Sequence, residues 1–325
     1  MTEKKRLSIL IYSNQTIPFI KLQKSYLEKL NHNVDVYIFE GKRNILKYMI
    51  EIKKIRSINR KKYDIIHAYD GSSGFIANFQ RGIPVITTFI GSDLLGNYSS
   101  NGRFDYGFSI ISFFASYAAQ LFSKKLITIS QNLSRRIYFN KKHKMIKLGV
   151  DHNHFNPIGM SAAREKLNWN NDAIYILFPA NKNRVIKRYG IAKEIIEEIS
   201  KEISSVKLIS LERPNMYPEL PLIMSGCNAM IFVSFHEGSP NVIKEALACN
   251  LPIFSFDIGD VAEQLEGVTH CHVVNNGNKT ALYKKLLDYL YKTPKKRSNG
   301  RNKIIPLSWD NYTVNVENIY YKALV

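Results

Sequence analysis

Short apolar runs alternate with amphipathic stretches along almost the whole chain, and this rhythm constrains the fold more than any other feature. Between the apolar runs lie stretches with apolar residues at helical spacing, such as 19–30 and 47–62. Strands separated by helices in this way predict a parallel, doubly wound sheet. The strand-like runs of the first half are 7–13, 33–39, 64–69, 84–89, 125–130 and 145–150.

The second half repeats the rhythm after a polar stretch at 149–172, which is typical of a linker. A chain of 325 residues suits two domains, and we place them at 1–156 and 157–306. The predicted strands of the second half are 173–180, 206–211, 228–235, 251–256 and 270–274. Its predicted helices are 185–203, 239–249 and 278–292, and a last helix follows Trp309.

Positive charge is concentrated in the first half of the chain. The first 150 residues hold 25 of the 46 Lys and Arg residues but only 9 of the 27 Asp and Glu residues. This asymmetry favours an anionic partner, whether a lipid headgroup layer, a phosphate-bearing acceptor or nucleic acid. A composition rich in Lys, Asn and Ile on solvated faces explains the same charge.

Other bulk features restrict the class of protein. The three cysteines lack metal-type spacing, which is typical of the reducing cytosol. The N-terminal segment has too short an apolar run for a signal peptide. No 18-residue apolar run appears, so we expect no membrane-spanning helix, and the most apolar stretch, 107–122, is typical of a buried or interfacial helix.

The strongest candidate site follows the strand predicted at 228–235. Glu237 lies just beyond the carboxyl end of that strand, where open α/β sheets bind ligands. Gly238, Ser239 and Pro240 then turn the chain into a helix, which Ser239 is expected to cap. The N–H groups and positive dipole end of such a helix bind diphosphates.

Glu245 lies about one turn inside the same helix, roughly 6 Å further along its axis. A carboxylate there can reach sugar or ribose hydroxyls while the N–H groups hold phosphate. The alternative is a solvent-exposed Glu237 in a loop and an exposed Glu245 on a helix.

A basic cluster follows the first strand of the second domain. Arg184 and Lys187 open the predicted helix at 185–203, where two cations can neutralise a leaving diphosphate. The alternative is a solvated basic face.

The run E-G-S-P-N-V-I-K-E-A at 237–246 resembles the E-x7-E motif of the retaining glycosyltransferases of family 4. The resemblance covers nearly the whole chain, in the right order. It implies the GT-B fold, with two Rossmann-like, doubly wound parallel-sheet domains that face a central cleft. Glu237 would then contact the donor sugar and Glu245 the ribose. The backbone N–H groups near Asn241 and Val242 would hold sugar or phosphate oxygens.

The basic cluster is also similar to the family, whose members use an Arg and a following Lys as the pyrophosphate pair. Arg184 and Lys187 are the best matches, but the spacing departs from the family. Many members place the Lys directly before a Gly, whereas here Tyr189 stands before the Gly. Arg188 is therefore the alternative to Lys187.

Two segments of the first domain also resemble the family. T-T-F-I-G-S-D at 87–93 is similar to T-F-H-G-S-D, with Ile90 in place of a phosphate- or sugar-binding His. Gly91 would let the backbone approach the substrate, and Asp93 would either orient acceptor hydroxyls or cap the following turn. D-I-I-H-A-Y-D-G at 64–71 makes His67 an acceptor-side candidate, against the alternative of a structural histidine.

The resemblance implies transfer of a hexosyl or N-acetylhexosaminyl group with retention of configuration. The donor would be a UDP- or GDP-sugar. The basic first half of the chain favours an acceptor at the cytoplasmic membrane face, a cell-envelope or lipid-linked glycan. The segment 307–325 resembles the closing helix that packs back on the N-terminal domain. We expect no cofactor and no metal, and a cytoplasmic protein that is peripheral at the inner membrane face.

Three other functions were weighed against this one. A non-catalytic relative acting as a partner subunit is favoured by Ile90 and by the spacing of Lys187. A nucleic-acid-binding protein is favoured by the charge but lacks a recognisable motif. A nicotinamide enzyme is disfavoured, because no G-x-G-x-x-G follows the first strand.

Overall fold

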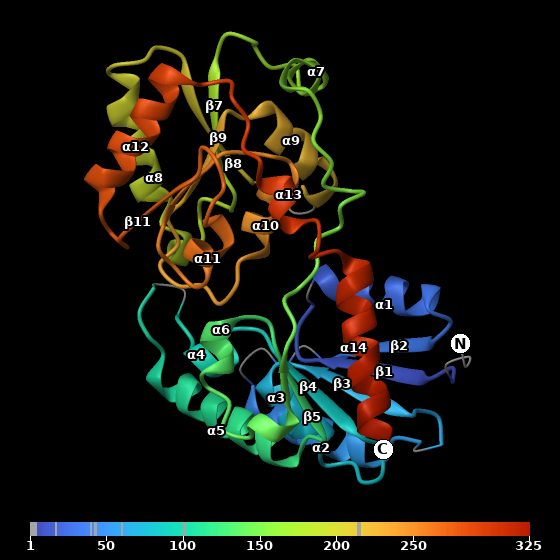
Figure 1. Ribbon diagram of the computed structural model, residues 1–325. Helices are drawn as coiled ribbons and strands as arrows, with labels where there is room; N and C mark the ends of the chain where they lie inside the picture. The colour runs from blue at the N-terminus through green and yellow to red at the C-terminus, as the bar shows by residue number, and fades with distance from the viewer. Residues whose placement is uncertain are drawn as a thin grey trace. The chain divides into compact units, whose positions relative to one another are not determined.

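The computed structural model describes residues 5–16, 18–39, 41, 44–59, 61–99, 102–212 and 216–325 (Figure 1). The chain forms two compact units. Unit 1 comprises Met1–Ser99, Phe104–Gly149 and Trp309–Val325, and unit 2 comprises Ser100–Arg103 and Val150–Ser308. Each unit holds one parallel sheet covered by helices, as the sequence predicted.

The sheet of unit 1 has six parallel strands. Their order is β2 (Asn33–Ile38), β1 (Ser8–Ser13), β3 (Ile65–Tyr69), β4 (Val85–Phe89), β5 (Lys125–Thr128) and β6 (His143–Met145). The helices are α1 (Pro18–Lys29), α2 (Ile45–Arg56), α3 (Gly71–Ala77), α4 (Ser92–Leu95), α5 (Tyr106–Phe122), α6 (Gln131–Ser134) and α14 (Trp309–Leu324). A 3-10 turn, η1, spans Asn140–Lys142. The strands β3 and β4 are buried along their whole length, which explains why they read as continuous apolar runs.

The predicted strand at 145–150 is displaced in the structure. The strand β6 ends at Met145, and Ile146 makes its last backbone bond, to Thr128 of β5 at 2.9 Å. Leu148 and Val150 lie outside the sheet but remain buried. The apolar residues at 145–150 therefore indicated side chains that pack in the core, and not a strand that pairs along its whole length.

The C-terminal helix α14 belongs to unit 1. Its buried side chains Trp309, Tyr312 and Tyr320 lie in the same apolar cluster as residues of α1 and of the strands β1 and β3. Trp309 lies 6.3 Å from Phe19 of α1, ring centroid to ring centroid. The last segment of the chain thus covers one face of the first sheet.

The sheet of unit 2 has five parallel strands. Their order is β11 (His272–Val274), β10 (Ile253–Phe256), β9 (Ala229–Phe232), β7 (Ile174–Phe178) and β8 (Val206–Ser210). The helices are α7 (Met160–Lys166), α8 (Tyr189–Ser200), α9 (Leu220–Gly226), α10 (Asn241–Ala248), α11 (Val261–Leu265), α12 (Lys279–Lys292) and α13 (Gly300–Ile304). Two 3-10 turns are η2 (Val185–Lys187) and η3 (Tyr217–Glu219).

The strand order of unit 2 reverses between β7 and β9. The chain passes from β7 outward to β8, and then returns to the other side of β7 to form β9. At such a switch point the loops leaving the two strands diverge and open a crevice at their carboxyl ends. The loop after β7 carries Arg184 and Lys187, and the loop after β9 carries Glu237.

Two predictions for unit 2 were wrong in detail. The expected linker at 149–172 contains the helix α7, whose buried Arg164 donates hydrogen bonds to Gly226 O at 2.9 Å and Asn228 Oδ1 at 2.7 Å. The helix expected from residue 185 begins only at Tyr189. Arg188 has φ 56° and ψ 46°, and this left-handed conformation separates the 3-10 turn η2 from α8.

Among the residues that the structure describes, no helix combines the length and the apolar character needed to cross a bilayer.

Candidate functional site

The loops after β7 and β9 bring together two of the predicted site residues. Lys187, in the 3-10 turn η2, forms an ion pair with Glu237, which lies in the loop between β9 and α10. The side chains are 14% and 18% exposed, so each can still meet a ligand. A backbone bond of 2.8 Å from Phe235 N to Ile186 O ties the two loops together. Residues 50 positions apart in the chain thus form one site.

A third loop, after β10, supports the backbone at Glu237. Gly259 has φ +65°, and a Cβ at this position would lie 2.9 Å from the carbonyl oxygens of Glu237 and Gly238. Only glycine allows this approach without moving the loop. Gly259 was not among the predicted site residues, although the run D-I-G-D directly after the strand β10 is a signal for a tight turn.

The helix α10 begins beside Glu237 without a side-chain cap. Pro240 occupies the N-cap position, and α10 runs from Asn241 to Ala248. The expectation that Ser239 caps the helix was wrong, because Ser239 precedes the N-cap residue. Its hydroxyl is buried, and within the described residues it has no hydrogen-bond partner. The N–H groups of Asn241 and Val242 lie in the first turn, where helices leave them for ligands.

Glu245 lies one turn further into α10 and is partly buried. Burial raises the pKa of its carboxyl group to about 7, and the neighbouring Lys244 only partly offsets this effect. Lys244 is itself buried and donates to Asn241 Oδ1 at 3.1 Å. A carboxylate placed in this way is suited to accept hydrogen bonds from ligand hydroxyls.

The other two cations of the site, Arg184 and Arg188, have different surroundings. Arg184 is exposed at the start of the 3-10 turn η2. The guanidinium of Arg188 stacks 4.4 Å from the ring of Phe235 and donates to Asn276 Oδ1 at 3.0 Å. Of the two alternatives, Lys187 rather than Arg188 contacts Glu237 in this structure.

In unit 1, Asp93 and Gly91 shape a turn at the carboxyl end of β4. Asp93 is buried, and it accepts hydrogen bonds from the N–H groups of Gly91 at 2.7 Å, Gly71 at 3.2 Å and Ile90 at 3.3 Å. Burial raises the pKa of its carboxyl group to about 6 despite these bonds. The contacts correspond to the turn-capping alternative, and a role toward acceptor hydroxyls stays a prediction.

Asp70 is a neighbour that the sequence analysis did not select as a site residue. It caps α3 by accepting from Ser73 N at 2.9 Å and Ser73 Oγ at 3.0 Å, with φ 73° and ψ 161°. Burial, together with the charge of Asp93, raises the pKa of Asp70 to about 7. Non-glycine residues rarely adopt this conformation, and strained positions of this kind gather at functional sites.

His67 lies on β3 with no exposed surface. Its Nδ1 is 2.7 Å from the Tyr320 hydroxyl, and its Nε2 is 2.7 Å from Thr88 Oγ1. Burial lowers the pKa of the imidazole to about 3, so the ring is neutral. This position indicates a structural role, and acceptor contact by His67 stays a prediction.

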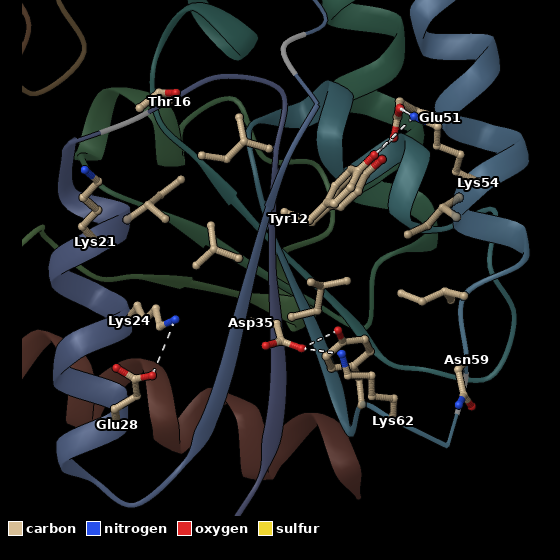
Figure 2. Close-up of a pocket in the computed structure, with 18 of the residues that line it drawn as sticks. Tyr12, Thr16, Lys21, Lys24, Glu28, Asp35, Glu51, Lys54, Asn59 and Lys62 are labelled. Carbon is tan, nitrogen blue, oxygen red and sulfur yellow. Dashed lines mark hydrogen bonds and ion pairs between the residues drawn. The ribbon is translucent and has the colours of Figure 1, made fainter.

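Unit 1 also holds a cavity of about 860 Å³ around the edge strand β2, between α1 and α2 (Figure 2). Three of the lysines that line it, Lys24, Lys54 and Lys62, form ion pairs with neighbouring carboxylates. Lys62 lies 2.8 Å from Asp35, and Lys54 lies 2.7 Å from Glu51.

The comparisons with known proteins point to the same loops. Residues 182–292 match the protein family described as Glycosyl transferases group 1, and this segment lies within unit 2. A relative in Methanocaldococcus jannaschii, named as an uncharacterized glycosyltransferase, is 21% identical and aligns over 92% of this chain and 86% of its own. The matched segment contains all the predicted site residues of unit 2.

Solved structures define the class of fold. A sucrose-phosphate synthase from Thermosynechococcus elongatus has a TM-score of 0.77 at 15% identity, and 98% of this chain covers 99% of that one. HepE of Anabaena, solved with UDP and glucose, has a TM-score of 0.69 at 15% identity, over 98% of this chain and 100% of that one. The two parallel-sheet domains thus have the GT-B fold, as predicted.

Proposed function

We propose that the protein is a retaining glycosyltransferase that takes a sugar from a nucleotide donor bound at the switch point of unit 2. The observation that carries the proposal is the contact of Lys187 with Glu237 beside the uncapped start of α10. A cation, a carboxylate and helix-end amides lie together after the carboxyl ends of β7 and β9, within the segment that matches the group 1 glycosyl transferases, and this supports the proposal.

The donor diphosphate would bind Lys187, Arg184 and the N–H groups of Asn241 and Val242. Negative charge grows on that diphosphate as the bond to the sugar breaks, and oriented cations and amides stabilise it. Lys187 would then share its charge between Glu237 and the phosphate. This neutralisation supports the prediction that transfer requires no divalent metal.

The two carboxylates of the E-x7-E motif would hold the two ends of the donor. Glu237, at the mouth of the crevice, would accept hydrogen bonds from the sugar hydroxyls. Glu245, one turn further along α10, would accept from the ribose hydroxyls of the nucleotide. Glu237 precedes α10 and Glu245 lies one turn inside it, so the two carboxylates can contact opposite ends of one donor molecule.

For the chemical step we propose a front-face route. The bond between the anomeric carbon and the phosphate oxygen breaks, and the acceptor oxygen bonds to that carbon on the same face. The acceptor proton passes to the departing phosphate oxygen. Because the new bond forms on the face that the phosphate leaves, the configuration is retained. No carboxylate in the site then has to act as a covalent nucleophile.

For the donor and the acceptor, the first candidates follow from the comparisons and the charge. HepE was solved with UDP and with UDP-glucose, so UDP-sugars are tested before GDP-sugars. The basic first half favours an anionic acceptor, and we propose a cell-envelope or lipid-linked glycan made on the cytoplasmic side.

The test starts with a panel of UDP- and GDP-sugars in a thermal unfolding assay, because a ligand of the folded state raises the melting temperature. One sugar nucleotide is expected to stabilise the protein, and Lys187→Met is expected to abolish most of that shift. Lys193→Met is the matched control, because Lys193 is an exposed lysine on α8 of the same unit.

The stabilising donor is then used in a transfer assay, with the anomeric configuration of the product read by NMR. Chelation of divalent metals is expected to leave the rate unchanged. An inverted product would refute the retaining mechanism, and equal donor shifts for Lys187→Met and Lys193→Met would refute the site.

A further inference from the structure

The helix α5 of unit 1 carries no charged side chain along its 17 residues. The side that it buries consists of small or polar residues. These are Ser109, Ser112, Ala115, Ser116, Ala118, Ala119 and Gln120. The helix packs closely on α3, since a Cβ at Gly71 would lie 1.9 Å from Ser116 Oγ. The small residues therefore hold α5 firmly against the domain (Figure 1).

The large apolar side chains of α5 point the other way, into solvent. Six of them follow one another at intervals of four, three, one, three and four residues, which places these six on a single stripe. Ile111 and Phe122 are exposed beside it. The stripe comprises Tyr106, Ile110, Phe113, Phe114, Tyr117 and Leu121. Phe114 is 75% exposed and Tyr106 is 73% exposed.

This pattern is the reverse of the one expected for a helix on a water-soluble domain, which buries its large apolar side chains and exposes polar ones. Soluble proteins rarely expose a contiguous apolar patch of this kind unless a partner covers it. The apolar stripe of α5 therefore indicates a docking surface.

A neighbouring segment extends the apolar surface at the C-terminal half of α5. Tyr138 is 73% exposed, and its ring lies 5.9 Å from that of Tyr117. The segment is tied to the helix, because Tyr138 N donates to Gln120 Oε1 at 2.9 Å and Lys142 Nζ donates to Leu121 O at 2.8 Å. The apolar face thus includes part of a second element.

Positive charge surrounds this end of the stripe. Residues 106–150 include eight Lys or Arg residues and no Asp or Glu. Lys124, Arg135, Arg136 and Lys141 are exposed in the segments that follow α5. A second copy of the chain docked here would bring two such basic rims together, which is unfavourable. An apolar face with a basic rim is instead complementary to an anionic lipid surface.

We propose that the apolar stripe of α5, with Tyr138 and its basic rim, docks unit 1 on an anionic lipid bilayer. The large side chains insert among the acyl chains near the headgroups, and the Lys and Arg side chains contact the lipid phosphates. The proposal goes beyond the transfer reaction and uses no residue of the donor site. It gives a lipid-linked acceptor a defined approach to the enzyme.

The experiment is co-sedimentation of the full chain with vesicles of phosphatidylcholine, alone or mixed with phosphatidylglycerol. We expect binding to the mixed vesicles that weakens as salt is added. The double variant Ile110→Ser with Phe114→Ser is expected to bind roughly tenfold less or weaker still, because two large apolar side chains no longer insert. Ile305→Ser, an exposed apolar residue of unit 2, is the matched control and should bind like the parent.

A second variant tests the rim. Arg135→Gln with Arg136→Gln is expected to reduce binding to the mixed vesicles and to flatten its salt dependence. Both double variants should keep the melting-temperature shift with the sugar nucleotide, so that a failed donor site is distinguished from a failed docking surface.

Three results would overturn the proposal. One is equal vesicle binding by the parent and the Ile110→Ser, Phe114→Ser variant. Another is no binding of the parent to anionic vesicles at low salt. The third is a concentration-dependent dimer that the same substitutions dissolve while vesicle binding is absent, which would assign the stripe to a second copy.

Discussion

Replacing Glu245 with Gln is expected to stabilise unit 2 while weakening donor binding. Burial raises the pKa of the Glu245 carboxyl from 4.5 to about 7. The folded state therefore binds this proton more tightly than the unfolded state. The Glu245 carboxyl therefore lowers the free energy of unfolding as the pH rises from about 4.5 to about 7, and above about pH 7 this reduction stays constant. Gln carries no charge at any pH and removes this cost.

The pKa shift sets an upper bound of about 3 kcal/mol on that cost, since one pKa unit corresponds to about 1.4 kcal/mol. Glu245 is only partly buried, so solvent reduces the effect, and we expect about 1 to 3 kcal/mol at pH 8. Below about pH 4.5 the parent carboxyl is protonated, and the two proteins should be equally stable.

Donor binding should change in the opposite direction. The amide of Gln accepts hydrogen bonds from ribose hydroxyls less strongly than a carboxylate does. The loss of a charged hydrogen bond is worth about 1.5 to 3 kcal/mol, so the affinity for the sugar nucleotide should fall by about tenfold or more. A gain in stability with a loss of affinity is the signature of a group kept for binding.

The assay is urea unfolding of parent and variant between pH 4.5 and pH 8, followed by tryptophan fluorescence. Trp169 lies in unit 2 and Trp309 in unit 1, so Trp309→Phe in both proteins leaves a reporter of unit 2 alone. Glu165→Gln, an exposed carboxylate on α7, is the control and should shift neither quantity. A Glu245→Gln protein that is less stable than the parent at pH 8 would refute the argument, because it would mean that the carboxylate is held by a partner.

Three further predictions concern single contacts. Gly259→Ala should lower donor affinity in a thermal shift assay, because the new methyl group pushes on the carbonyl of Glu237; unchanged affinity would show that the loop adapts. His67→Leu should cost about 2 kcal/mol of unit 1 stability in urea with donor affinity intact, because the buried hydroxyls of Tyr320 and Thr88 each lose a hydrogen bond; a lost transfer rate at normal stability would instead support the acceptor role. A double-mutant cycle of Lys187→Met and Glu237→Gln should give a coupling of about 1 to 3 kcal/mol in unfolding of the apo protein, and additive effects would mean that the ion pair is not formed in solution.

Most of the sheet architecture could be predicted from the sequence. Buried parallel strands such as β3 and β4 read as short apolar runs, and the helices between them have their own apolar period. The errors fell at the ends of elements and in the expected linker at 149–172, where the helix α7 was missed. Residues 145–150 and the start of α8 were misplaced, because a buried side chain looks the same in a strand as in an irregular segment, and because nothing in the sequence marks the left-handed Arg188.

The candidate site was predicted less completely. Glu237 and Lys187 were selected because each follows a strand, which is a local property. Ser239 was assigned a capping role that the helix start at Asn241 removes, since the N-cap position then falls on Pro240, which has no side-chain acceptor. Gly259 was passed over, because its role depends on the backbone of Glu237 and Gly238, 22 and 21 residues away in the chain.

For the stretch 107–122, too, the sequence predicted part of the result and the structure decided the rest. Its composition indicated a helix that is either buried or interfacial. Only packing against α3 decides that Ser and Ala face the domain and that Phe and Ile face outward. The side of α5 that is buried depends on contact with α3, and the sequence of α5 alone does not specify that contact.

The sequence by itself determined the parallel α/β character of both halves, the loops that carry charge, and the excess of positive charge in the first half. The tertiary structure alone decided that β7 and β9 are neighbours, which brings Lys187 to Glu237, and which side of α5 meets solvent. The reason is physical. Periodicity and strand ends are set by neighbours along the chain, whereas the order of strands and the direction of a helix face are set by contacts between distant segments.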